Sequence, residues 1–221
     1  MLFINLKTYE NGTGEKALAF IKEVENIQKE VDAPITILAQ ATDIRLFSSN
    51  TNIPIWTQHI DNVSYGKNTG WILANSVMQA GAKGSMINHA EHKIPLTDVS
   101  EIVEKYESNT FGIMISATSN EEITLLEQFK PKYISYEPQE YIGTKISVID
   151  AASDLIQSIL QKISTPLVIG AGIHKPEHIV TGIEMGVHGF LISSDVLLSE
   201  NPIDRIKEYM LAYKDAYNSF H

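Results

Sequence analysis

The chain has 221 residues, 43% of them hydrophobic, 20% charged and 8% aromatic, and 17 basic against 27 acidic side chains give a formal net charge of −10. This composition is typical of a globular chain and excludes disordered and collagen-like proteins; we expect a single domain over residues 1–221. The absence of cysteine excludes disulfides, thiolate metal sites and thiol nucleophiles. The negative charge argues against a nucleic acid or an anionic membrane as partner.

The beginning of the chain lacks the features of a secretion signal. Residues 1–7 contain no basic region that leads into a long apolar stretch. No uninterrupted apolar run in the chain approaches the roughly 20 residues that a membrane helix needs. We therefore expect a cytoplasmic protein.

Short apolar runs rich in β-branched residues recur along the chain and are typical of buried strands. They lie at Leu2–Ile4, Ile35–Leu38, Ile53–Trp56, Ser85–Ile87, Phe111–Ile115, Tyr133–Ser135, Leu167–Ile169 and Gly189–Ile192. Segments with helical spacing of apolar residues separate these runs, such as Ala17, Phe20, Ile21 and Val24, or Val148, Ala152, Leu155, Ile156 and Ile159. Strand and helix alternate about eight times, which predicts an α/β fold with a parallel sheet.

Eight such units fit either a closed barrel or an open, doubly wound sheet. Polar residues or glycines follow several different strands, at Asn5, Asn88, Glu137 and Gly170, whereas an open sheet concentrates them at one switch point. The first strand is also not followed by the G-x-G-x-x-G of a dinucleotide-binding sheet. A closed (β/α)8 barrel is therefore favoured.

Asn5 and Lys7 end the first strand, and alternation directs both side chains away from Leu6, toward the inside of a barrel. A lysine there is costly unless it is paired or meets an anionic ligand. The alternative is a lysine that reaches solvent from the strand end.

His89 follows the fourth strand, where we expect it at the opening of a helix, with a neutral ring that hydrogen-bonds a carbonyl and exchanges a proton. A histidine with a purely structural role is the alternative, and a zinc deaminase site is excluded because it needs cysteines.

Glu137 closes the sixth strand as a carboxylate at the barrel mouth. Pro138 restricts Glu137 to extended geometry and Gly143 supplies a flexible point, so the following segment is predicted to be a hinged lid. A surface glutamate before an ordinary turn is the alternative. Glu121 and Glu122 are interpreted as the solvated start of another helix.

Gly170 and Gly172 separate the seventh strand from a helix, where exposed backbone N–H groups bind phosphate. The next residues, His174 to His178, have the zinc-protease pattern H-x-x-E-H, but Pro176 favours the first turn of a helix, so that no metal site is expected. 

After the last strand, Ser193 or Ser194 is expected to cap a helix and donate to an anion. Asp195 would weaken phosphate binding unless its carboxylate points away.

In chain order, Asn5-x-Lys7, Asn88-His89-x-Glu91, Tyr136-Glu137-Pro138 with Ile142-Gly143-Thr144, and Gly170-x-Gly172 resemble the triosephosphate isomerase family, in particular its shorter, archaeal-type branch. The resemblance covers essentially the whole chain. It implies a TIM barrel that interconverts dihydroxyacetone phosphate and D-glyceraldehyde 3-phosphate through an enediol(ate), in glycolysis and gluconeogenesis, without a metal or an organic cofactor.

The resemblance also implies roles for single residues, and the division of labour between base and electrophile is the family's known chemistry. Glu137 resembles the base, His89 the neutral electrophile and Lys7 the cation that stabilises the enediolate. Asn5 would orient the substrate oxygen, and Glu91 would pair with Lys7.

Gly143, Gly172, Ser193 and Ser194 would bind the substrate phosphate. The lid would consist of Pro138, Gln139, Glu140, Tyr141, Ile142, Gly143 and Thr144. Residues 58–70 resemble the long third loop that packs into a neighbouring subunit, which places Thr69 near the partner's site and implies a homodimer, or a tetramer as in some archaeal-type relatives.

Four residues depart from the family pattern: Ala90 replaces a usual serine, Lys93 a usual arginine and Lys145 a usual glycine, and Asp195 stands in a turn of small residues. Two alternatives stay open. One is an aldolase-like lyase that forms a Schiff base on Lys7, and the other is a non-catalytic protein that binds a phosphorylated metabolite.

Overall fold

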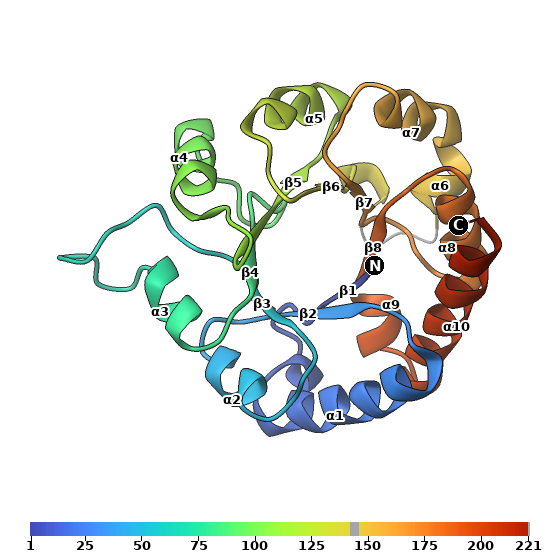
Figure 1. Ribbon diagram of the computed structural model, residues 1–221, viewed down its shortest axis with the longest axis horizontal. Coiled ribbons are helices and arrows are strands. Elements are labelled where there is room, and N and C mark those ends of the chain that lie inside the picture. The colour runs from blue at the N-terminus through green and yellow to red at the C-terminus, as the bar shows by residue number, and fades with distance from the viewer. Residues whose placement is uncertain (142–145, 221) are drawn as a thin grey trace.

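The computed structural model describes residues 1–141 and 146–220, in which eight parallel strands form a closed barrel in the order β1 to β8 (Figure 1). The strands are β1 Leu2–Asn5, β2 Ile35–Ala39, β3 Ile55–Thr57, β4 Gly84–Ile87, β5 Gly112–Ala117, β6 Tyr133–Tyr136, β7 Leu167–Ile169 and β8 Gly189–Ile192. The predicted α/β fold and its closed barrel are confirmed. The prediction that Ile53 belongs to a strand is wrong, because β3 begins at Ile55.

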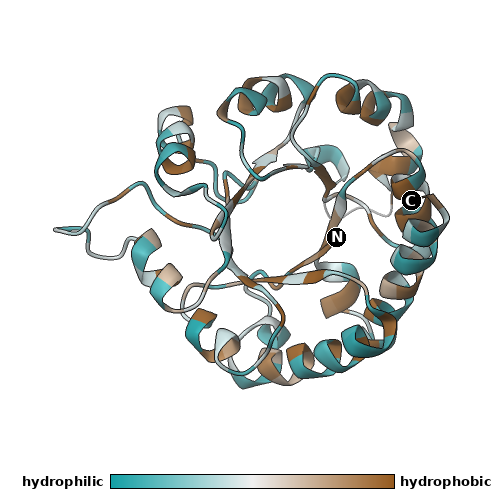
Figure 2. Ribbon diagram, in the orientation of Figure 1, coloured by the Kyte–Doolittle hydropathy of each residue, from teal (hydrophilic) through white to brown (hydrophobic). Residues whose placement is uncertain are grey.

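Helices surround the barrel and turn their hydrophobic residues toward the strands (Figure 2). They are α1 Gly14–Val31, α2 Ile44–Ser48, α3 Ala74–Gln79, α4 Leu96–Tyr106, α5 Asn120–Leu126, α6 Val148–Ala151, α7 Ser153–Leu160, α8 Pro176–Glu184, α9 Ser194–Leu197 and α10 Pro202–Phe220. Short 3-10 turns lie at η1 Glu10–Gly12, η2 Glu127–Phe129 and η3 Gln139–Tyr141.

The helix predicted through Val148 to Ile159 is two helices, α6 and α7. Ala152 separates them with φ −137° and ψ 35°, which is not helical backbone. The Ser147 hydroxyl accepts from the Ile149 N–H at 3.2 Å and caps α6. The apolar spacing survives the break, because both helices still bury their apolar residues against the barrel.

Two hydrophobic layers result from the alternation of side chains along each strand. One lies between the strands and the helices. The other fills the inside of the barrel and consists of Phe3, Leu38, Trp56, Met86, Met114, Tyr133, Val168 and Leu191. Two residues further along several strands, the inward positions are polar or glycine: Asn5, Ser116, Ser135, Gly170 and Ser193. The carboxyl ends of the strands therefore form a polar mouth above an apolar plug.

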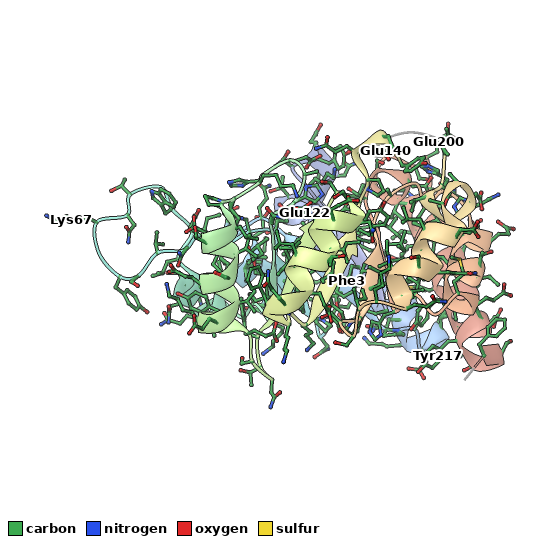
Figure 3. All side chains as sticks on the ribbon, turned by 90° about the horizontal axis from the view of Figure 1, so that it is seen from above. Phe3, Lys67, Glu122, Glu140, Glu200 and Tyr217 are labelled. Atoms are coloured by element: carbon green, nitrogen blue, oxygen red, sulfur yellow. The ribbon has the colours of Figure 1, made fainter. Side chains whose placement is uncertain are left out.

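One segment departs from the compact outline. The loop between β3 and α3 extends away from the barrel at the left of Figure 1, and Figure 3 places Lys67 at its far end. Figure 3 also separates the two ends of the barrel, with Glu140 and Glu200 at one and Tyr217 at the other. Within the described residues, no helix has the length and apolarity to span a membrane.

Candidate active site

Lys7 reaches the mouth of the barrel from a left-handed turn just after β1. Its φ is 47°, a conformation that non-glycine residues adopt rarely. Two contacts hold the turn: the Lys7 N–H donates to Asn5 Oδ1 at 3.0 Å, and Gln58 Nε2 donates to the Lys7 carbonyl at 3.0 Å. Asn5 itself is only 3% exposed. The predicted inward position of Asn5 agrees with the structure, and its side chain shapes the turn that carries Lys7.

The Lys7 ammonium is paired with a carboxylate. Its Nζ lies 2.6 Å from Glu91 Oε1, and the Lys7 side chain is 19% exposed. The two residues are 84 positions apart in the chain and come from the loops after β1 and β4. The structure therefore brings Lys7 and Glu91 together, as the family resemblance implied.

His89 lies in a turn, and the prediction that it opens a helix is wrong. Asn88 has φ 58° and the His92 N–H donates to the His89 carbonyl at 2.8 Å, which closes a turn directly after β4. Helix α4 begins only at Leu96, after Pro95 in extended geometry. The helix dipole invoked to keep the ring neutral is therefore absent at His89.

A backbone hydrogen bond sets the tautomer of the neutral His89 ring. The Glu91 N–H donates to His89 Nδ1 at 3.2 Å, which assigns the ring proton to Nε2 in the neutral tautomer. Nε2 lies 3.3 Å from Glu137 Oε2. Burial alone lowers the pKa of His89, but the nearby carboxylates, Glu137 first, outweigh burial and raise this pKa.

Glu137 directly follows β6 inside the mouth and is 5% exposed. Its N–H donates to the Ala117 carbonyl at 2.9 Å, and Ser135 Oγ lies 3.3 Å from its Oε1. The alternative of a solvated surface glutamate is excluded by this burial. The alternative of a Lys7 that simply reaches solvent from the strand end is not supported, because its Nζ is paired with Glu91 and it lines one hollow of about 230 Å³ with Glu137.

Gly170 makes room for the Glu137 side chain, and its predicted role in phosphate binding is wrong. A Cβ at position 170 would lie 2.4 Å from Glu137 Cγ. The Gly170 N–H donates to the Tyr136 carbonyl at 3.0 Å, so it is engaged in the sheet and not free for an anion.

Gly172 has a different constraint. Its φ is +71°, and a Cβ there would lie 2.2 Å from the Ile146 carbonyl oxygen. Gly172 thus packs directly on the chain that follows the predicted lid.

The lid prediction is only partly covered by the structure. Pro138 follows Glu137, residues Gln139–Tyr141 form η3, and the Tyr141 N–H donates to the Pro138 carbonyl at 3.0 Å. Ile142, Gly143, Thr144 and Lys145 lie outside the described residues.

The Ser193 side chain does not cap the helix that follows it. Its hydroxyl donates to the Asn5 carbonyl at 2.8 Å, and α9 begins at Ser194 without a side-chain cap. The prediction of a serine cap from Ser193 is therefore wrong, because the neighbouring β1 offers its hydroxyl a closer acceptor. Both serines line the same hollow as Glu137 and Gly172.

Asp195 turns toward α10. Arg205 Nε donates to Asp195 Oδ2 at 2.8 Å, and the Tyr209 hydroxyl donates to the same oxygen. The Arg205 cation thus relieves the expected conflict between the Asp195 carboxylate and a phosphate. The sequence alone did not connect Arg205 with Asp195, because the two lie ten positions apart in the chain.

Glu122 is a supporting residue that sequence reasoning missed. Its carboxylate accepts from Asn88 Nδ2 at 2.9 Å, Lys93 Nζ at 2.6 Å and the Thr118 N–H at 2.7 Å. The prediction that Glu121 and Glu122 start a helix is confirmed, because both lie in the first turn of α5. The Glu122 carboxylate is not merely solvated, however, because it contacts both ends of the loop that carries His89. The lysine at position 93, where the family usually has arginine, was the feature of the sequence that could have indicated this role of Glu122.

The H-x-x-E-H motif does not form a metal site in the described part of the chain, where no group of three ligating side chains occurs. Pro176 opens α8 as predicted, so that His174 precedes the helix and His178 lies within it. His178 Nε2 instead contacts Asp150 Oδ2 at 3.1 Å.

Two sequence families match the chain. Residues 1–113 match the model described as Triosephosphate isomerase, and residues 140–220 match the model described as Thiazole biosynthesis protein ThiG. The triosephosphate isomerase of Sulfurisphaera tokodaii is 34% identical over 215 residues, which cover 96% of this chain and 94% of that relative. The triosephosphate isomerase of Methanothermus fervidus is 32% identical over 213 residues, 94% of this chain and 96% of the relative.

The chain belongs to the triosephosphate isomerase family. Both relatives cover at least 94% of the chain, which includes the regions of His89 and Glu137, whereas the first family match ends before Glu137. A crystal structure of triosephosphate isomerase from Bartonella henselae superposes with a TM-score of 0.72, 17% identity and coverage of 98% of both chains, which supports the fold. The predicted resemblance to this family is confirmed.

Proposed function

We propose that the chain interconverts dihydroxyacetone phosphate and D-glyceraldehyde 3-phosphate, with Glu137 as the base. Membership of the triosephosphate isomerase family supports the reaction. The observation that supports the residue assignment is the contact between buried Glu137 and His89, whose facing atoms lie 3.3 Å apart beside the paired Lys7. A base, a proton donor and a cation at one mouth are the groups that an enediolate reaction needs.

The reaction moves one proton between adjacent carbons. The Glu137 carboxylate removes a proton from C1 of dihydroxyacetone phosphate, and the C–H electron pair forms the enediolate double bond. The His89 Nε2–H hydrogen-bonds the substrate oxygens and moves a proton between them. Glu137 then returns its proton to C2, which gives the aldehyde. Lys7 stabilises the negative oxygen that develops in between, and Asn5 orients it.

Phosphate would bind at the end of the same hollow, where Gly172, Ser193 and Ser194 lie. Asp195 lines the same hollow, and its carboxylate is neutralised by the Arg205 guanidinium. We assign Gly143 to the same anion site and residues 138–144 to a closing lid. Close-range backbone donors would hold the phosphate on a chain of net charge −10, because surface charge further away is screened.

We further propose that the chain is at least a homodimer. The loop from Asn62 to Trp71 projects from the barrel, with Tyr65 71% and Trp71 60% exposed. A second hollow of about 370 Å³ adjoins Lys7 and is lined by Thr42, His59 and His92, among others. The loop of a second copy, with Thr69 near its end, would fill this hollow. A tetramer remains a further assembly to test, and a glycolytic role would place the enzyme in the cytoplasm.

The structure favours isomerisation over Schiff-base chemistry at Lys7. A Schiff base requires an amine that is free to attack a carbonyl, whereas the Lys7 Nζ is engaged with the Glu91 carboxylate at 2.6 Å. The non-catalytic alternative has no observation in its favour, since Glu137, His89 and Lys7 are all in place.

A coupled isomerase assay in both directions tests the proposal. Wild-type turnover should fall by about 10³-fold or more in Glu137→Gln, which keeps the shape but removes the base. Glu104→Gln is the matched control, because it makes the same chemical change on an exposed position of α4. Equal rates in wild type and Glu137→Gln would identify contaminating host enzyme and overturn the proposal.

A further inference from the structure

Two serine hydroxyls lie beneath the proposed base, inside the barrel. Ser135 in β6 and Ser116 in β5 are register partners, and both are 0% exposed. They point inward like Tyr133 and Met114, which lie two residues earlier on the same strands in the apolar plug. Hydroxyls in such a position must find partners in the protein, because water does not reach them.

The distances connect the two hydroxyls to Glu137. Ser135 Oγ lies 2.7 Å from Ser116 Oγ and 3.3 Å from Glu137 Oε1. Each hydroxyl donates only one hydrogen, and an ionised carboxylate only accepts. Ser135 Oγ is the donor in both contacts, so Ser116 Oγ and the Glu137 carboxylate accept from the same hydroxyl, and an ionised carboxylate is the stronger acceptor of its one hydrogen.

The carboxylate is thereby held from two sides. Ser135 contacts Oε1 from below, and His89 Nε2 lies 3.3 Å from Oε2. Among the described residues, the charged side chains that line this hollow beside Glu137 are Lys7, Glu91 and Asp195, and the other titratable ones are Tyr9 and His174. His89 and Lys7 both face the substrate, so Ser135 is the donor that stays on the carboxylate when substrate occupies the mouth.

We infer that Ser135 is a positioning residue that orients the Glu137 carboxylate by donating to its Oε1. This role rests on the proposed function, because it acts through the base. A hydroxyl hydrogen bond favours the charged carboxylate over the protonated one. No proton passes along the pair: the Ser135 O–H bond stays intact, and the proton taken from substrate resides on Glu137.

The pH dependence of kcat/KM tests this role. In Ser135→Ala the acid limb of the profile should move to higher pH by about half a unit to one unit, since the charged form of the base loses a donor. At neutral pH kcat should fall several-fold, with a smaller change in KM. Ser116→Ala removes a competing acceptor and should not move the acid limb to higher pH, and Ser135→Thr, which keeps a hydroxyl, should restore the wild-type profile.

Ser85→Ala is the matched control. Ser85 is a strand serine in β4 that is also 0% exposed, but its hydroxyl donates to the Met86 carbonyl at 2.7 Å and its side chain lies on the opposite face of the strand from Met86. It should lose a buried hydroxyl without moving the acid limb.

The outcomes separate the two proposals. An unchanged acid limb in Ser135→Ala, with turnover that still collapses in Glu137→Gln, overturns the role of Ser135 alone. A shift of equal size in Ser85→Ala also overturns it, because the effect would then be a general one of core hydroxyl loss. Absence of isomerase turnover in the wild type overturns the proposed function and this role with it. If Ser135→Ala fails to fold, Ser135→Cys, which keeps the size but has a weaker donor, decides the outcome by the same shift of the acid limb.

Discussion

The carboxylate of Asp195 is bound by the guanidinium of Arg205, with Nε 2.8 Å from Oδ2, although Asp195 stands in the turn next to the proposed phosphate site. Arg205 also donates to the His174 carbonyl at 2.7 Å. One side chain therefore neutralises Asp195 and connects the loop after β7 to the turn after β8. The hydrogen bond to Asp195 raises the pKa of Arg205 further above its ordinary value, which keeps the cation charged.

We expect Arg205→Ala to raise KM for triose phosphate by about 10-fold with a smaller change in kcat, because an unpaired carboxylate then lies near the substrate dianion. The double variant Arg205→Ala with Asp195→Asn should recover most of the lost affinity. Steady-state kinetics at fixed ionic strength measure both. Arg45→Ala removes an exposed arginine of α2 and serves as control. A KM that stays high in the double variant would show that Arg205 acts through the His174 loop and not through charge.

Much of the fold was predictable from sequence because it depends on short-range patterns. The runs that became β7 and β8 have the bounds predicted from their apolar residues alone. The break at Ala152 was not predictable, since the apolar spacing continues across it and only the local backbone differs.

The candidate site was predictable in its residues and less so in its contacts. Asn5, Lys7, His89 and Glu137 follow strands, and the barrel brings strand ends together. The contacts of Asp195 with Arg205 and of Glu122 with Asn88 join elements that no spacing rule connects. Gly170 shows the same limit, because the sequence indicated a glycine between strand and helix but not the Glu137 side chain that requires it.

Lys7 should not form a Schiff base with a triose phosphate. Its Nζ is engaged with the Glu91 carboxylate at 2.6 Å and is not free to attack a carbonyl. Incubation with dihydroxyacetone phosphate and borohydride, followed by intact-mass measurement, should give no stable adduct. Lys105, which is exposed and paired with Glu101, controls for non-specific trapping. An adduct mapped to Lys7 would favour the lyase alternative.

Stability should fall as the pH is lowered from about 8 to 5.5. Burial lowers the pKa of His59, His178 and His188 below the ordinary 6.5, and lowers the pKa of the Met1 amino group to about 4. The unfolded chain therefore binds more protons in this window, so the free energy of unfolding rises with pH. His89 opposes this trend, because its raised pKa contributes stability at low pH that is lost as the pH rises through it.

The net expectation is a melting temperature lower by several degrees at pH 5.5 than at pH 8, measured by differential scanning fluorimetry. In His59→Asn the melting temperature should depend less on pH. The variant lacks the buried ring, 7% exposed in the wild type, that must stay neutral in the folded chain. A melting temperature that is constant or higher at pH 5.5 would contradict the assignment.

The two tryptophans should report the proposed dimer. Trp56 is 4% exposed in the barrel plug, whereas Trp71, the last residue of the projecting loop, is 60% exposed. If that loop enters a second subunit, Trp71 is shielded from water in the dimer. Dilution should dissociate the dimer, move the tryptophan emission to longer wavelength and lower the specific activity. Trp71→Phe should remove the spectral change. Emission that does not depend on concentration, together with a monomer mass by light scattering, would contradict the dimer.

Gly170→Ala should impair catalysis more than folding. A Cβ at this position would lie 2.4 Å from Glu137 Cγ and 2.6 Å from its Cδ, and those atoms belong to a side chain, which can shift more easily than backbone. The fold is therefore expected to survive with Glu137 displaced from His89 and Ser135. Since misplacement by about 1 Å costs about 10²-fold in rate, kcat should fall by that order while the melting temperature drops only slightly.

Gly172→Ala provides the contrast. Its φ of +71° and the approach of the Ile146 carbonyl to 2.2 Å involve backbone on both sides, so strain there is relieved only by moving the loop. We expect Gly172→Ala to lower the melting temperature and raise KM, because it disturbs the phosphate end of the hollow and not the base. The two glycines are placed differently, one under Glu137 and one against the chain after the lid. An equal loss of kcat with the same change in stability in both variants would show that this difference does not explain their roles.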